Sequence, residues 1–118
     1  MSIQAIASQF VDLCNQGKNF DVMRTMYAPD IVSVESEGNQ TSGQQAVIQK
    51  SERWAAGLEI HGEKVLGPYI HGDRFAVHFT FEVTPRATGR RTTQQEVGVY
   101  TVKNDKIVRE EFFNAGNW

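Results

Sequence analysis

The feature that most constrains this chain is a run from residue 75 to residue 83 in which every second side chain is apolar. The alternating apolar side chains are Phe75, Val77, Phe79, Phe81 and Val83. A period of two is typical of a β-strand with one buried face, whereas a helix would scatter the same residues around its circumference. Thr84-Pro85 ends the run, because proline has no backbone N–H and restricts the residue before it. The run therefore predicts a strand whose apolar face needs a cover.

Two more strand-like runs follow, over residues 93–102 and 106–113. Asn104-Asp105 lies between them, and both residue types tolerate the positive φ that a tight hairpin requires. The three runs together predict an antiparallel meander with one strongly apolar face.

The N-terminal part of the chain predicts two helices. Ser2 can cap a helix whose apolar residues recur at three- and four-residue spacing, and Gly17 provides a left-handed stop. Asn19 is expected to cap a short second helix over residues 20–27. Pro29 prevents that helix from continuing.

The middle of the chain alternates between extended and helical patterns. Residues 30–37 predict a strand, and Ser42-Gly43 opens a third helix with Val47 and Trp54 on one stripe. Residues 58–70 predict a long strand with a kink or bulge, since glycines interrupt it. Helices followed by a run of strands predict an α+β fold, with the helices packed on one face of a curved antiparallel sheet.

Length, charge and cysteine content narrow the classes of function. A chain of 118 residues can form one domain, over residues 1–118, with its own core. The net charge of −2 argues against a nucleic-acid binder, which normally has a basic face. Cys14 is the only cysteine, and no signal segment or membrane-length apolar stretch is recognisable. We expect a soluble, cytoplasmic protein that binds neither nucleic acid nor membranes.

No residue pattern indicates a metal or a cofactor. No group of His, Cys, Asp or Glu has metal-ligand spacing. Phosphate-binding glycine loops, nucleophile elbows and CxxC motifs are also lacking. We therefore expect neither a metal nor a cofactor.

Several segments resemble one known family in the same order along nearly the whole chain. They are residues 10–15, residues 27–35, residues 43–54 and residues 99–108. They are similar to the SnoaL-like branch of the nuclear transport factor 2-like superfamily, which includes the ketosteroid isomerases. The resemblance implies a cone-shaped, cystatin-like α+β fold, in which three helices of the N-terminal half pack on a strongly bent mixed or antiparallel sheet around an internal pocket. This fold hosts enzymes and non-enzymes alike.

The resemblance also implies candidate site residues. In the isomerases a carboxylate on the first strand transfers the proton, and Glu35 aligns with it. A tyrosine and a protonated aspartate hold the developing oxyanion there, and the matching positions in this chain are Phe10 and Gly98. Neither can donate a side-chain hydrogen bond, and one oxyanion donor is worth about 2.7–4 kcal/mol of barrier. Steroid-type isomerisation by that route is not expected, and the histidine–aspartate pair of the polyketide cyclases has no clear counterpart.

Strand parity suggests a different polar set. If Gly98 faces the pocket, Glu96 and Tyr100 face it too. A pocket carboxylate, Glu35 or Glu96, oriented by Tyr100, is then the catalytic candidate for a cofactor-independent isomerase, cyclase, dehydratase or hydrolase. The predicted ligand is a small, largely apolar organic molecule. Its predicted shell is Phe10, Cys14, Tyr27, Trp54, Val77, Phe79, Phe81 and Gly98.

Two registers are open for the last strand. A two-residue turn at Asn104-Asp105 would direct Arg109 and Glu111 into the pocket. A three-residue turn with a bulge would instead direct Val108, Glu110 and Phe112 there. The second register is favoured because it places two apolar residues on the core face, and it adds Glu110 and Phe112 to the predicted ligand-binding set.

The competing interpretation is a non-catalytic ligand carrier or interaction module. Under it, Glu35 is a solvated charge at a strand end, and the later glutamates pair with arginines on the sheet surface. Cys14 is then a small apolar filler. His78 is expected outside the cone under either interpretation, because it lies opposite the apolar face of its strand.

The strand over residues 93–102 predicts a partner. It is apolar on both faces, with Val97 and Val99 on one side and Tyr100 and Val102 on the other. A strand buried on both sides needs a second layer outside the sheet. No helix is left to supply that layer, so we expect a homodimer packed through the outer sheet face.

Overall fold

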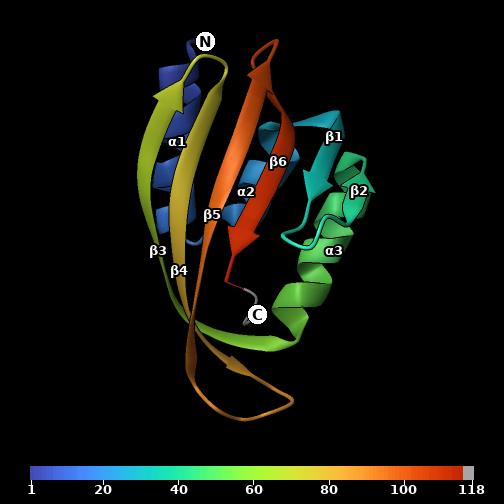
Figure 1. Cartoon of the computed structure of the whole chain (residues 1–118), viewed down its shortest axis with the longest axis vertical. Coiled ribbons are helices and arrows are strands. Elements are labelled where there is room, and N and C mark those ends of the chain that lie inside the picture. The colour runs from blue at the N-terminus through green and yellow to red at the C-terminus, as the bar shows by residue number, and fades with distance from the viewer. Residues whose placement is uncertain (116–118) are drawn as a thin grey trace.

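The computed structural model describes residues 1–115, in which three helices pack on one six-stranded sheet (Figure 1). The helices are α1 (Ile3–Asn15), α2 (Asn19–Thr25) and α3 (Gln44–Ala56). The strands are β1 (Tyr27–Val34), β2 (Gln40–Ser42), β3 (Leu58–His71), β4 (Arg74–Pro85), β5 (Thr92–Lys103) and β6 (Lys106–Asn114). The sheet order is β2-β1-β6-β5-β4-β3, and it is mixed because β1 runs parallel to β6. The predicted α+β class is confirmed.

Helix α1 forms as its sequence pattern predicts. The Ser2 side chain accepts a hydrogen bond of 3.1 Å from the Ala5 N–H, which satisfies one of the free donors at the helix start. Gly17 follows the helix end with φ +75°, a conformation that favours glycine. The face that α1 buries against the sheet consists of Ile6, Ala7, Phe10, Val11 and Cys14.

The alternation that predicted β4 corresponds to a buried inner face. Phe75, Val77, Phe79, Phe81 and Val83 are all buried, and the residues between them are only half-buried. Strands β3, β4, β5 and β6 form a continuous antiparallel meander. In Figure 1, α1 and α2 lie behind these strands, so they cover this inner face.

The long strand β3 is interrupted where its glycines predict. Its pairing with β4 shifts register between Ile60 and Gly62 and again between Leu66 and Tyr69. Gly67 has φ +124°, and a Cβ there would lie 3.0 Å from the Ala76 carbonyl oxygen. The second irregularity therefore needs glycine on conformational and steric grounds.

The boundaries predicted for α2 and β1 were wrong. The helix ends at Thr25 and the strand runs over Tyr27–Val34, so the strand starts earlier than expected, includes Pro29 and stops before Glu35. Tyr27 pairs with Ile107 of β6, and the pairing shifts between Tyr27 and Val32, which accommodates a proline without an N–H. These boundaries are set by the pairing of β1 with the distant strand β6, which the local sequence pattern does not show.

The predicted cap of α2 was also wrong. The N-cap residue is Lys18, not Asn19, and its side chain forms no capping hydrogen bond.

The register of β6 differs from both predicted alternatives. Asn104 and Asp105 have φ of 52° and 63°, and Lys103 pairs with Lys106 across a two-residue turn. A bulge follows, since Val102 pairs with Ile107 but Thr101 pairs with Arg109. The extra residue inverts the facing of the rest of the strand.

The bulge has two consequences for side-chain placement. Tyr100 pairs with Glu110 and Gly98 with Phe112, so the favoured facing of Glu110 and Phe112 is correct although the predicted turn is not. Val108 was expected on the core face, and this was wrong. Ile107 occupies that position, fully buried, while Val108 is half-buried at the bulge.

Candidate functional site

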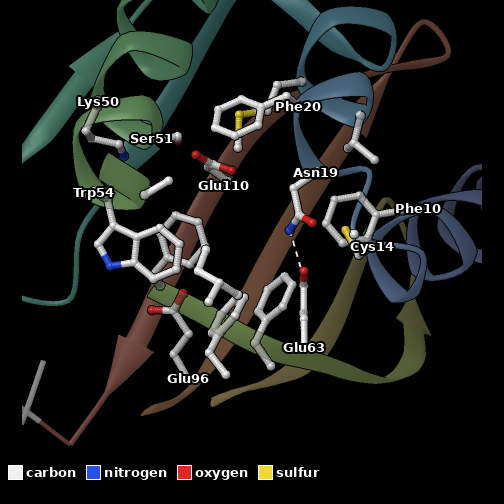
Figure 2. A pocket seen from close by; sticks show the side chains of 18 of the residues that line it. Phe10, Cys14, Asn19, Phe20, Lys50, Ser51, Trp54, Glu63, Glu96 and Glu110 are labelled. Carbon is white, nitrogen blue, oxygen red and sulfur yellow. Dashed lines mark hydrogen bonds between the residues drawn. The ribbon is translucent and has the colours of Figure 1, made fainter. Parts of the chain in front are cut away.

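A cavity of about 770 Å³ lies between the inner face of the sheet and the three helices. Figure 2 shows it bounded by α3 with Lys50 and Trp54 on one side and by Asn19 and Phe10 on the other. Most predicted site residues line it. They are Phe10, Cys14, Tyr27, Glu35, Trp54, Phe79, Phe81, Glu96, Tyr100, Glu110 and Phe112.

Two predicted residues are not on the cavity wall. Val77 is buried within the apolar core. Gly98 is covered by the ring of Tyr100, because a Cβ at Gly98 would lie 2.8 Å from Tyr100 Cε2 and 2.9 Å from its hydroxyl. Glycine at position 98 therefore lets the Tyr100 ring lie flat along β5, and the ring rather than the glycine reaches the cavity.

Glu110 is the most deeply buried carboxyl group of the cavity. Its side chain is 2% exposed and accepts a short hydrogen bond from the Tyr27 hydroxyl. Burial raises its pKa above the ordinary value, while hydrogen bonds from Tyr27 and Ser33 and the charge of Lys50 act in the opposite direction. Parallel pairing of β1 with β6 brings these groups together, since Ser33 pairs with Glu110.

Lys50 connects this buried group to Glu35. Its ammonium donates to Ser33 Oγ at 2.7 Å and to Glu35 Oε1 at 2.5 Å, and it lies 5.7 Å from the ring centroid of Phe112. Glu35 follows the last residue of β1, and its side chain is partly buried in an ion pair rather than solvated. The sequence analysis missed Lys50. The helical spacing of Val47, Lys50 and Trp54 places it on the inward stripe.

Glu96, on β5, has fewer partners, since its side-chain hydrogen bond within the described residues is with Asn114. Burial, followed by the nearby charges of Glu35 and Glu110, raises the pKa of Glu96 to about 8, although Asn114 and Lys50 lower it. The predicted surface pairing with arginine is wrong for Glu96 and Glu110. The same interpretation is correct for Glu111, which pairs with Arg109 at 3.1 Å, while Arg91 pairs with Glu82 at 3.8 Å.

Glu63, on β3, is a second carboxyl group that the sequence analysis missed. It accepts a hydrogen bond of 2.8 Å from Asn19 Nδ2, drawn as a dashed line in Figure 2. Burial raises its pKa to about 7, despite that hydrogen bond. Alternation within β3 is broken by bulges, so only its pairing with Phe81 of β4 places Glu63 on the inner side.

Aromatic rings form most of the remaining wall. Trp54 packs edge-on against Phe81 with ring centroids 5.3 Å apart, and Phe81 stacks on Phe79 at 5.6 Å. Tyr100 contacts Phe10 at 4.5 Å and stacks on Phe75 at 5.1 Å. The cavity thus combines apolar walls with a few carboxyl groups, which is the usual composition of a small-molecule site.

Cys14 and the outer histidine behave as the sequence predicts. Cys14 is buried, and burial raises the pKa of its thiol above the ordinary value, so the group is a neutral, apolar filler. His78 lies away from the cavity, beside Val97 and Phe113 on the outer face of the sheet. Neither residue contributes a charged group to the cavity.

In residues 1–115, the part of the chain that the structure describes, neither a cluster of metal-binding side chains nor a helix that could span a membrane is present. Within that range, no three or more His, Cys, Asp or Glu side chains gather in a way that could hold a metal ion. None of the helices there combines the length and the apolar character needed to cross a membrane. That the protein uses no metal or cofactor remains a prediction.

The arrangement defines a class of protein: an α+β pocket fold in which a mixed sheet and three helices enclose a cavity with titratable carboxyl groups. The family profile described as the SnoaL-like domain matches residues 1–114. The chain therefore belongs to the SnoaL-like domain family, and the resemblance drawn from its sequence is confirmed. The curated proteins include no significant match to it.

Solved structures agree with this assignment. A candidate SnoaL-like polyketide cyclase from Mesorhizobium loti, whose description also gives carbohydrate phosphatase in brackets, is 46% identical with a TM-score of 0.92. The alignment covers 96% of this chain and 99% of that one. A candidate polyketide cyclase from Pseudomonas putida is 16% identical with a TM-score of 0.76, over 99% and 94% of the two chains.

A protein with a ketosteroid isomerase-like fold from Catenulispora acidiphila, solved in complex with trimethylamine, is 15% identical with a TM-score of 0.76. That alignment covers 94% of this chain and 85% of that one. At such low identity, this structure and the one from Pseudomonas putida support the fold alone. Another related structure, from Xanthomonas campestris, is described as having a cystatin-like fold.

Proposed function

We propose that this protein binds a small, largely apolar organic molecule in the cavity and transfers a proton to or from it through Glu96. The single observation that carries the proposal is a half-buried carboxyl group, lining a mainly apolar cavity, whose pKa is raised to about 8. A group that titrates near neutral pH can both accept and donate a proton at low cost. Tyr100, on the same strand, would orient the bound molecule.

Glu96 is preferred to Glu35 as the proton-transfer group for a structural reason. The Glu35 carboxylate is held by the Lys50 ammonium at 2.5 Å, so taking up a proton would break an ion pair. Glu96 forms no ion pair of this kind with any residue of the described range. Glu35 and Lys50 then serve to set the charge of the cavity wall.

The test is hydrogen–deuterium exchange at the carbon next to a carbonyl group, with phenylacetone as probe. In D₂O, protein-catalysed exchange should rise with pH through about 8, because the base is the carboxylate form of Glu96. Glu96→Gln should lower the protein-catalysed rate by roughly 100-fold. Glu52→Gln, an exposed glutamate on α3 outside the cavity, is the matched control and should not change it. No exchange above the buffer rate would exclude this proton-transfer role.

A non-catalytic carrier or interaction module is the second candidate. Its support is the tight hydrogen bonding of Glu110, Tyr27, Lys50 and Glu35, which gives these polar groups a structural role without any reaction. Binding of phenylacetone without exchange, unchanged in Glu96→Gln, would favour this candidate.

We also propose that the protein forms a homodimer through the outer face of the sheet. Val97 and Phe113 pair across β5 and β6, and they are 37% and 53% exposed on this face. Large apolar side chains side by side on a sheet favour coverage by a second layer. Analytical ultracentrifugation at micromolar concentration should show a dimer, and Phe113→Lys should shift it toward monomer. A wild-type monomer would contradict the proposal.

A further inference from the structure

The cavity contains more carboxyl groups than its cationic side chains can neutralise. Lys50 is the only lysine or arginine on the described wall, and Glu35 already holds it. His61 is exposed at the rim and bonds to Thr84 Oγ1 at 2.7 Å. The other titratable groups that share the cavity with Glu96 are Cys14 on α1, Tyr27 on β1, Glu35 and Glu37 after β1, Lys50 on α3, His61 and Glu63 on β3, Tyr100 on β5 and Glu110 on β6.

Glu96 lies next to an aromatic wall. Figure 2 shows its carboxyl group beside the indole ring of Trp54, which in turn packs on Phe81. A carboxylate next to an aromatic face is a favourable environment for an ammonium group, which is attracted by both. The cavity already holds one such arrangement, because the Lys50 ammonium lies over the Phe112 ring while it pairs with Glu35.

The Tyr100 hydroxyl is a second, independent indication of a ligand atom. Tyr100 is 1% exposed and lines the cavity, yet its hydroxyl takes part in no hydrogen bond with any residue of the described range. Buried hydroxyl groups normally have a partner. The ring lies over Gly98, two residues from Glu96 on the same side of β5, so the hydroxyl and Glu96 belong to the same part of the cavity wall.

We propose that the molecule bound in this cavity is a small organic amine, held as its ammonium ion between Glu96 and Tyr100. The apolar part of the amine packs on Trp54, Phe79 and Phe81. The proposal rests on the proposed function in that both use the same cavity and the same glutamate. On binding, the carboxylic acid of Glu96 loses its proton, to the nitrogen when the amine arrives neutral or to solvent when it arrives charged.

The sign of the pH dependence follows from the charges. Burial and the neighbouring glutamates keep Glu96 protonated up to a pKa of about 8 in the free protein, and a bound cation opposes this by stabilising the carboxylate. Affinity for an ammonium ion must therefore rise with pH until Glu96 is ionised. A neutral molecule of the same shape can accept a hydrogen bond from the protonated carboxyl group of Glu96. Its affinity therefore does not increase when a rise in pH ionises Glu96.

Isothermal titration with 2-phenylethylamine and 2-phenylethanol tests the proposal, because the two probes share a body and differ in charge. Between about pH 6 and about pH 8.5 the amine affinity should increase roughly tenfold or more, while the alcohol affinity should stay constant or fall. Titration in two buffers of different ionisation enthalpy should also show proton release on amine binding at neutral pH. An amine that binds no more tightly than the alcohol, or whose affinity does not rise with pH, overturns the proposal.

Single-residue variants test which side chains cause the pH dependence of amine affinity. Glu96→Gln should abolish the rise with pH, and Glu52→Gln, outside the cavity, should retain it. Trp54→Leu provides a test that does not depend on the glutamate, and it should weaken the amine several-fold more than the alcohol. Equal loss for both probes overturns the amine assignment.

Different experimental outcomes would contradict the amine proposal alone and the proposed function as a whole. Tighter binding of the alcohol, with carbonyl exchange intact, overturns the amine alone. A dissociation constant above about 10 mM for both probes, with no exchange, removes both proposals.

Discussion

The two halves of β4 have the same alternating pattern but different surroundings. Phe75, in the first half, is buried, packs against Phe10 and Tyr100 with ring centroids 5.3 Å and 5.1 Å away, and does not line the cavity. Phe79 and Phe81, in the second half, line the cavity. Alternation therefore identifies an inner face, but the helix side chains opposite it decide whether that face becomes solid core or a cavity wall.

The largest expected effect comes from truncating a ring in each half. Phe75→Ala should lower the free energy of unfolding by about 3–5 kcal/mol, because it leaves a void among packed rings. Phe81→Ala should cost clearly less, since it enlarges a space that already exists. Urea denaturation of both variants measures the difference, and equal losses would mean that the second half is as tightly packed as the first.

The second contrast is between the pH dependence of stability of the wild-type protein and that of the Glu96→Gln variant. The folded-state pKa of Glu96, about 8, lies above the ordinary value of 4.5, so its contribution to stability is complete below about pH 4.5 and declines as pH rises to about 8. Glu96→Gln removes this titration, so the variant should gain stability relative to wild type by a few kcal/mol over that range. Urea denaturation at several pH values measures it. A parallel pH dependence of the two proteins would show that Glu96 is not the buried acid.

The third contrast is between Glu110, whose carboxyl group is held by the hydroxyl groups of Tyr27 and Ser33, and Glu96, whose hydrogen bond is with Asn114. Glu110→Ala should destabilise by about 1–3 kcal/mol, because it leaves the Tyr27 hydroxyl buried without its acceptor. Glu110→Gln keeps an acceptor for Tyr27 and should cost less. Thermal unfolding of both variants measures the difference. A neutral Glu110→Ala change would mean that the hydrogen bond contributes little.

The smallest expected effect lies outside the cavity. Ser2→Ala removes the side-chain acceptor for the Ala5 N–H and should cost about 1 kcal/mol, the usual value of a helix cap. Ser2→Asn, which retains a capping side chain, should cost nearly nothing. Ligand affinity should not change in either variant, and any change would indicate that the start of α1 is coupled to the cavity.

Local patterns predicted the elements whose own residues specify them. The apolar stripe of α1, the alternation of β4 and the Asn104-Asp105 turn are each contained within a few neighbouring residues. Parity along β5 likewise placed Glu96 and Tyr100 on the inner side, where both line the cavity. Side-chain direction within one regular element follows from its period, so the sequence suffices there.

Features set by contact between distant segments could not be predicted in this way. The start of β1 depends on pairing with β6, and the placement of Glu63 depends on pairing of a bulged strand with β4. The facing of Glu110 depends on a bulge beyond the hairpin turn. The raised pKa of Glu96 depends on its burial in the folded chain and on the charges of Glu35 and Glu110, which come from other strands or segments.

By itself, the sequence determined the fold class and the strand faces, because hydrophobic periodicity and turn chemistry are local properties, and its resemblance to known sequences indicated the family. The tertiary structure alone decided which part of the inner face stays hollow and which carboxyl groups meet there. Those outcomes depend on desolvation and on charges brought together from β1, β3, β5, β6 and α3, and neither exists until the chain has folded.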